Sequence, residues 1–195
     1  MRPVIKRFGK EKPKKLGECN AHKVLYCGVS ALRKVTPCWL SAGTLLGIYR
    51  DGELMPDDHD IDVGAICFPD YREADIIKSM TTEGFSLWRR MTYNGRPMQL
   101  VFLHDDERCL FDIYFFERQG YEIVNYNYLG VLRKPIDLFE PLGVYEKFGR
   151  TAYPVPNDIE RYLEIRYGKD WRQKKGGSPD WGDYAANLTR WTERM

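Results

Sequence analysis

Apolar side chains recur every three or four positions between residues 18 and 35, which is the period of an amphipathic α-helix. Gly28 interrupts this segment and Pro37 ends it. Similar patterns predict shorter helices at 44–49, 70–83 and 157–167. Runs of apolar and β-branched residues predict strands at 38–40, 61–68, 85–93, 97–104, 109–117 and 121–128. Asn94-Gly95, between two of these strands, favours a tight hairpin turn.

The predicted elements do not alternate regularly between strand and helix. This order indicates an α+β fold with a mixed β-sheet flanked by helices, rather than a doubly wound domain. At 195 residues the chain is long enough for a single domain with a full core. Neither GxGxxG nor GxxxxGK[ST] occurs, so the common dinucleotide and P-loop sites are excluded.

Charge is distributed unevenly along the chain. Residues 1–15 hold seven Lys or Arg and one acidic residue, so the remainder is net acidic although the whole chain carries +2. We therefore predict a basic, flexible leader at 1–17, a folded domain at 18–172 and an aromatic, charged tail at 173–195. The simplest interpretation of the leader is a solvated arm. The alternative is electrostatic attraction to anionic lipid or to a polyanionic glycan.

Cysteine usage and hydropathy indicate the compartment. The five cysteines form no CxxC pair, which is typical of free thiols in a reducing environment. No stretch approaches the roughly 20 apolar residues that span a bilayer, and the N-terminus lacks the apolar core of a secretory signal. We expect a cytoplasmic protein, with peripheral membrane contact if the leader binds lipid. We expect no nucleic-acid partner, since no basic, aromatic stripe lies outside the leader.

Acidic residues crowd the start of the strand predicted at 61–68. Side chains two apart on a strand point to the same face, so Asp60 and Asp62 are candidates to bind one divalent ion. Mg²⁺ prefers such oxygen ligands together with substrate phosphates, and Mn²⁺ is the alternative ion. Asp58 is a candidate for one of two roles. It could contact the metal-binding carboxylates, or it could act as the base for an acceptor hydroxyl.

Three further residues are candidates to contact phosphate. Gly43 and Thr44 begin a predicted helix, whose N-terminal N–H groups and dipole attract anions. An ordinary helix cap is the alternative for this dipeptide. Arg50 offers a bidentate phosphate contact, although a lone surface arginine often has no such role.

Asp112 lies within the apolar run CLFDIYFF at 109–116. A buried carboxylate is costly unless it is paired or bound to metal, and a half-exposed strand that points Asp112 to solvent is the alternative. Together with Asp60 and Asp62 it predicts a three-carboxylate site for one or two Mg²⁺ ions.

These residues also carry a family resemblance. The runs WLSAGTLLGIYR at 39–50 and MPDDHDID at 55–62 are similar to the signature of the LicD/fukutin family, except that Asp57 replaces a tryptophan. The segment DIYF at 112–115, and Pro156 together with YLEIRYGKDW at 162–171, resemble later motifs of the same family. The resemblance covers most of residues 37–172.

The resemblance implies a nucleotidyltransferase-like fold and a Mg²⁺-dependent transferase. Such an enzyme moves a phospho-alcohol, such as phosphocholine or ribitol phosphate, from a CDP-linked donor to a sugar hydroxyl of a glycan or glycolipid. By position, Asp60, Asp62 and Asp112 are then metal ligands, and Gly43 and Thr44 contact the donor phosphates. Two alternatives stay open: a nucleotidyltransferase that adds a nucleoside monophosphate to a small acceptor, and a non-catalytic binding domain of the same fold.

Overall fold

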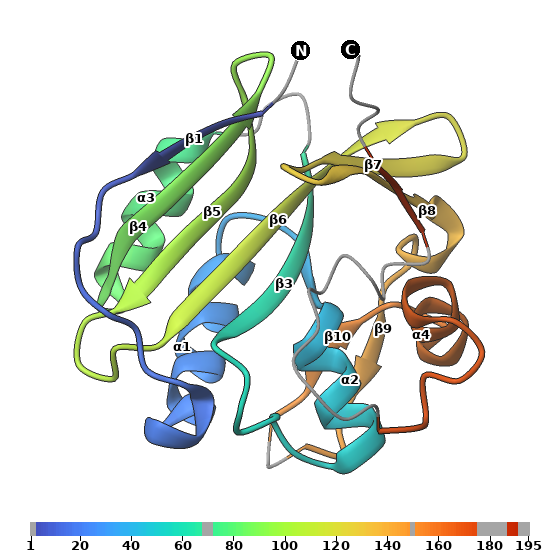
Figure 1. Cartoon of the computed structure of the whole chain (residues 1–195), viewed down its shortest axis with the longest axis horizontal. Helices are drawn as coiled ribbons and strands as arrows, with labels where there is room; N and C mark the ends of the chain where they lie inside the picture. The colour runs from blue at the N-terminus through green and yellow to red at the C-terminus, as the bar shows by residue number, and fades with distance from the viewer. Residues whose placement is uncertain (1–2, 68–71, 149–150, 175–186, 191–195) are drawn as a thin grey trace.

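The computed structural model of the chain describes residues 3–67, 72–148, 151–174 and 187–190. Within them it has four α-helices, eleven strands and two short 3-10 helices, at Leu16–Glu18 and Ile136–Leu138 (Figure 1). The α-helices are α1 Ala21–Arg33, α2 Ala42–Asp51, α3 Glu73–Thr82 and α4 Ile159–Tyr167. The strands are β1 Val4–Arg7, β2 Cys38–Leu40, β3 Asp60–Cys67, β4 Phe85–Tyr93, β5 Arg96–His104, β6 Leu110–Gln119, β7 Glu122–Tyr126, β8 Gly130–Pro135, β9 Gly143–Tyr145, β10 Tyr153–Val155 and β11 Leu188–Arg190.

One large sheet organises these elements. Its strands follow the order β1-β4-β5-β6-β7-β8-β11, and β3 joins it alongside β6 and pairs in turn with β2. The β3–β6 pair is parallel, whereas every other strand pair among the described residues is antiparallel. The predicted α+β fold with a mixed sheet flanked by helices is therefore confirmed.

The alternation of side chains along β6 gives the sheet two different faces. Phe111, Ile113 and Phe115 are fully buried on the face that packs against α1. Gly28 lies where α1 crosses β6, and a Cβ there would stand 2.3 Å from the ring of Phe111. The glycine that weakens the helical pattern is thus what allows the helix to approach the sheet closely.

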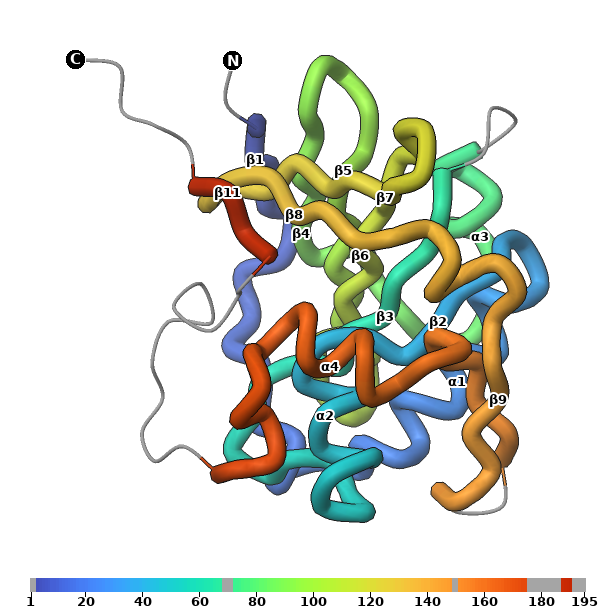
Figure 2. Tube along the Cα trace, turned by 90° about the vertical axis from the view of Figure 1, so that its right-hand side faces the viewer, coloured from blue at the N-terminus to red at the C-terminus, as the bar shows by residue number. Residues whose placement is uncertain are grey.

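Two helices belong to the other side of the molecule. Figure 2 shows α2 and α4 next to each other, and the two helices are in contact. α4 begins at Asp158, whose side chain accepts a hydrogen bond from the Arg161 N–H. Asp112 alternates with Phe111 and Ile113 along β6, so it lies on the face of β6 opposite α1.

The predicted β4–β5 hairpin is confirmed. Tyr93 pairs with Arg96, which leaves Asn94 and Gly95 as a two-residue turn. Both have positive φ angles, 50° and 77°, as the turn that matches the twist of a hairpin requires.

The structure contains strands that the sequence analysis did not predict. The leader is not a free arm over the residues described: β1 pairs with β4, and the Leu16 N–H donates to the Asp58 carbonyl. The strands β8 Gly130–Pro135, β9 Gly143–Tyr145 and β10 Tyr153–Val155 follow β7, and β11 in the tail pairs with β8. These strands are short, and apolar and polar side chains do not alternate clearly along them. Pairing with neighbouring strands therefore determines their structure more than their local sequence does. The start of the helix predicted at 70–83, at Asp70, lies outside the described residues.

None of the described helices combines the length and apolar character that crossing a membrane requires.

Candidate metal centre

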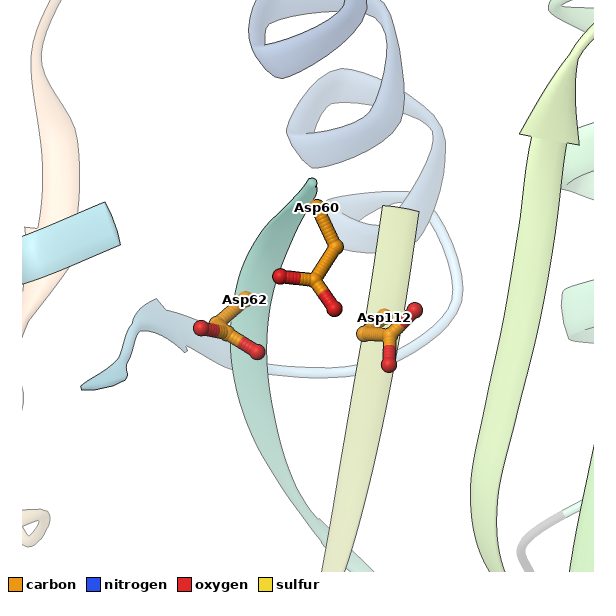
Figure 3. A group of neighbouring side chains, drawn as sticks. All are labelled: Asp60, Asp62 and Asp112. Carbon is orange, nitrogen blue, oxygen red and sulfur yellow. The ribbon is translucent and has the colours of Figure 1, made fainter. Parts of the chain in front are cut away.

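The parallel pairing of β3 with β6 brings the three predicted ligands together. In the register Asp62 stands opposite Asp112, and Asp60 lies two residues earlier on β3. One carboxylate oxygen from each aspartate lies within 4.8 Å of the others. Figure 3 shows the three side chains on the same face of the two strands, with Asp60 directed between the other two and α1 behind the strands.

Burial makes this cluster electrostatically unfavourable without a cation. Asp112 is fully buried and Asp62 is 8% exposed. Burial raises the pKa of Asp112 to about 7. Burial, followed by repulsion from the neighbouring carboxylates, raises the pKa of Asp60 and Asp62 well above the usual range of aspartate.

The two oxygens of Asp112 have different surroundings. Oδ2 accepts a hydrogen bond of 2.6 Å from Gln99 Nε2 and lies 3.6 Å from Arg89 Nη2. Oδ1 is buried and has no hydrogen-bond partner among the described residues. A buried carboxylate oxygen without a partner is costly, whereas a bound cation would satisfy it. The three carboxylates are hard oxygen ligands of the kind that Mg²⁺ and Mn²⁺ prefer, so they fit a divalent metal.

The turn that leads from β2 into α2 is bonded to Asp62. The Ser41 N–H donates to the Asp62 carbonyl at 3.1 Å, and the Gly43 N–H donates to Asp62 Oδ2 at 3.3 Å. In return, the Asp62 N–H donates to Thr44 Oγ1 at 2.8 Å. Both the backbone and the carboxylate of Asp62 are therefore held by the start of α2.

Gly43 lies against the acidic cluster. A Cβ at this position would stand 2.6 Å from Asp58 Oδ2 and 3.5 Å from Asp62 Oδ2. A side chain would therefore displace the carboxylates, and glycine allows the backbone N–H to approach them.

Asp58 lies at the edge of the cluster. Its Oδ1 accepts a hydrogen bond from the His59 N–H at 2.9 Å, while its Oδ2 faces Gly43. Burial raises the pKa of Asp58. The structure thus brings together Asp58, Asp60, Asp62, Asp112 and Gly43.

The other two predicted phosphate ligands have different surroundings. Thr44 is buried, and its hydroxyl accepts the Asp62 N–H. Arg50 lies seven residues beyond Gly43 on α2, about 10 Å along the helix axis. Its guanidinium contacts both carboxylate oxygens of Asp51, at 3.1 and 2.9 Å. The predicted contacts of Thr44 and Arg50 with phosphate stay predictions.

The sequence analysis missed two neighbours of Asp112. Gln99 is on β5 and Arg89 is on β4, and both reach Asp112 across the sheet. Only the strand order places them there, since neither belongs to an acidic or glycine-rich motif. The strand register explains how Arg89 reaches Asp112, because Val101 on β5 pairs with Arg89 on β4 and with Asp112 on β6.

Comparisons with known proteins place the sequence in one family. The sequence model of the family described as "LicD/FKTN/FKRP, nucleotidyltransferase domain" matches residues 35–158, which include Asp60, Asp62 and Asp112. Ribitol-5-phosphate transferase FKTN from Macaca fascicularis is 30% identical over 156 residues, and the human protein of that name is 29% identical over 156 residues. Each alignment covers 78% of this chain but 33% of the relative, so the chain spans about a third of the length of these proteins.

Among solved structures, the antibiotic-resistance factor ANT(2'')-Ia aligns with a TM-score of 0.43 and 16% identity, over 77% of this chain and 69% of its own. The family match covers well over half of the chain and contains the β3–β6 pair on which the carboxylates meet. The chain therefore belongs to the LicD/FKTN/FKRP family, and residues 35–158 are its nucleotidyltransferase domain.

Proposed function

We propose that this domain transfers a phospho-alcohol, such as phosphocholine or ribitol phosphate, from a CDP-linked donor to a sugar hydroxyl of a glycan or glycolipid. The reaction depends on Mg²⁺, with Mn²⁺ as a substitute. The acceptor oxygen forms a new bond to the phosphorus of the phospho-alcohol, the bond from that phosphorus to the bridging oxygen breaks, and CMP leaves.

One observation carries this proposal. Three carboxylates from two strands converge within 4.8 Å, and one of their buried oxygens has no partner among the described residues. Such an arrangement stabilises the fold poorly by itself, because like charges repel in a desolvated site. It suits a site that is complete only with a metal and an anionic substrate.

Asp60, Asp62 and Asp112 would hold the metal. When bound, the ion would neutralise the diphosphate and stabilise the departing CMP. Gly43, at the start of α2, would direct its N–H and the positive end of the helix dipole toward a donor phosphate. Asp58 would accept the proton of the acceptor hydroxyl, a role that its raised pKa favours.

The test is a donor panel. The purified chain is incubated with CDP-choline, CDP-ribitol or CDP-glycerol and a set of simple glycosides, and CMP release is measured with Mg²⁺ and with EDTA. We expect release with at least one donor, dependent on Mg²⁺ and on acceptor. Asp62→Asn should abolish it, and Asp57→Asn should not, since the Asp57 side chain is 94% exposed and forms an ion pair with Lys15. Release that persists in EDTA would contradict the proposal.

The same panel separates the two alternatives. An acceptor that gains a labelled nucleoside monophosphate, in place of free CMP, would identify a nucleotidyltransferase. A calorimetric titration with donor and Mg²⁺ that produces no heat would identify a non-catalytic domain.

We also propose that the leader brings the domain to an anionic membrane surface. Val4, Ile5 and Phe8 are 66%, 52% and 44% exposed, and they flank Lys6 and Arg7 at the sheet edge that β1 forms. Exposed apolar groups beside cations favour the interface of an anionic bilayer. Deletion of residues 1–15 should lower recovery on phosphatidylserine vesicles at low salt. Equal recovery would contradict this proposal and leave the catalytic one intact.

A further inference from the structure

Lys134 places a positive charge in the interior of the protein. It lies on β8 and is 2% exposed. Its Nζ lies 4.6, 5.9 and 4.5 Å from the centres of the Phe116, Phe139 and Tyr162 rings. Lys134 Nζ donates a hydrogen bond to Tyr162 Oη, at 3.1 Å. Burial of an ammonium group is costly, and aromatic rings offset only part of that cost.

The hydroxyl of Tyr162 connects this lysine to the turn before α2. Besides Lys134, Tyr162 Oη accepts a hydrogen bond from the Ala42 N–H at 3.1 Å and lies 2.7 Å from Ser41 Oγ. An ammonium group and a backbone N–H can only donate, so they occupy both lone pairs of the tyrosine oxygen. The tyrosine O–H then donates to Ser41 Oγ, and every hydrogen-bonding position of Tyr162 Oη is used.

The turn that Tyr162 holds is strained. Ala42 has a φ of 40°, in the left-handed region that non-glycine residues rarely adopt. Ser41 stands at the N-cap position of α2, yet its side chain makes no capping bond to the helix. It is bonded to Tyr162 instead, so the conformation depends on a contact from α4 rather than on a local cap.

This strained turn is also the segment that binds Asp62. The Ser41 N–H donates to the Asp62 carbonyl and the Gly43 N–H donates to Asp62 Oδ2. A continuous path therefore runs from Lys134 through Tyr162 and the turn to a candidate metal ligand. It joins β8, α4, α2 and β3, which are far apart in sequence.

We propose that Tyr162 and Lys134 are positioning residues of the metal centre, which hold the Ser41–Gly43 turn so that Asp62 and the Gly43 N–H keep the geometry needed for metal and phosphate. Neither contacts substrate, because Ser41, Lys134 and Tyr162 are at most 3% exposed. This inference rests on the proposed function only where CMP release is measured. The Mn²⁺ affinity can be measured whether or not the proposed reaction is correct.

The experiment compares two buried tyrosines. Tyr162→Phe removes the hydroxyl that holds the turn. Tyr153→Phe removes another hydroxyl at a buried position, on β10 and beside Phe148. For each purified chain, Mn²⁺ affinity is measured by calorimetry with the metal alone, unfolding by urea, and CMP release as kcat and KM.

We expect Tyr162→Phe to weaken Mn²⁺ binding by about 10- to 100-fold, the range found when a partner of a metal ligand is removed. We expect kcat to fall as well and Tyr153→Phe to leave Mn²⁺ binding unchanged. Mn²⁺ affinity of Tyr162→Phe within twofold of the unmodified chain would overturn the proposal, and so would an equal loss in both variants. If Tyr162→Phe does not fold, Lys134→Met applies the same criterion, because methionine fills the space between the rings without the charge.

The two proposals fail in different ways. If no donor releases CMP but Tyr162→Phe still weakens Mn²⁺ binding, the proposed reaction is wrong and the positioning role holds. If CMP release is Mg²⁺-dependent but Mn²⁺ affinity does not respond to Tyr162→Phe, the positioning role alone is wrong. An unmodified chain that binds no Mn²⁺ overturns both.

Discussion

Replacement of Asp112 by asparagine should stabilise the metal-free chain while it removes a metal ligand. Asparagine has nearly the same shape, and its Oδ1 can accept the hydrogen bond that Gln99 Nε2 now donates to Asp112 Oδ2. The substitution deletes a negative charge that is buried beside Asp60 and Asp62. Its main effect on the metal-free chain is therefore electrostatic.

The size of the effect follows from the pKa. Burial raises the pKa of Asp112 from 3.8 to about 7, and each pKa unit corresponds to about 1.4 kcal/mol. At pH 8 the group is mostly ionised in the folded chain, so folding carries an unfavourable contribution of about 4 kcal/mol. Asparagine removes it, and this figure is the upper limit of the expected stabilisation. With a urea m-value of about 2 kcal/mol/M, the midpoint should rise by up to about 2 M.

The assay is urea unfolding at pH 8, first with EDTA and then with MgCl₂. In EDTA, Asp112→Asn should unfold at higher urea than the unmodified chain. In MgCl₂ the difference should shrink or reverse, since only the unmodified chain gains stability from the ion. Asp106→Asn is the control, because the Asp106 side chain is 81% exposed and pairs with Lys23; it should change the free energy of unfolding by no more than about 0.5 kcal/mol in either condition.

One result would refute this reasoning. If Asp112→Asn unfolds at the same or lower urea than the unmodified chain in EDTA, the Asp112 charge is compensated within the protein, by Arg89 and Gln99. The case for a metal would then lose its electrostatic basis.

Three further predictions test the centre and its surroundings. Asp60→Ala and Asp62→Ala should each reduce CMP release by about 100-fold or more with the circular dichroism spectrum unchanged, since both remove a direct ligand; unmodified rates at saturating Mg²⁺ would rule out the mechanism. Gly43→Ala should lower the free energy of unfolding by about 1–3 kcal/mol and weaken Mn²⁺ binding in calorimetry, because its Cβ would meet Asp58 Oδ2, and an alanine variant with unchanged affinity would show that the turn adapts. In EDTA, the contribution of Asp112 to stability should be fully present below about pH 4 and be lost as the pH rises through about 7, since its folded-state pKa is raised; urea midpoints that increase across this range would contradict it.

The sequence predicted the acidic part of the site because the information is local. Two aspartates separated by one residue on a strand must share a face, and Asp112 in an apolar run needs a partner. The register of β3 on β6 turned these separate signals into one cluster. The Asn94-Gly95 hairpin was predictable for the same reason, since the backbone of two residues determines it.

The remaining parts of the site depend on which strands become neighbours. Arg89 and Gln99 reach Asp112 only because β4 and β5 lie beside β6. Lys134 is a lone lysine in a segment with frequent Pro and Gly, and nothing in its local pattern predicts burial. β1 and β11 are three or four residues long and gain their structure from pairing with distant strands, which local propensity does not encode.

The parallel pairing of β3 with β6 also affects how the protein folds. Asp62 and Asp112 are fifty positions apart in the chain, so the centre can assemble only after a large loop has closed, a step that entropy makes slow. A slip of one position would turn Asp112 toward the hydrophobic side next to α1. A divalent ion added during refolding would then bind and stabilise only those molecules in which β3 and β6 are in the correct register.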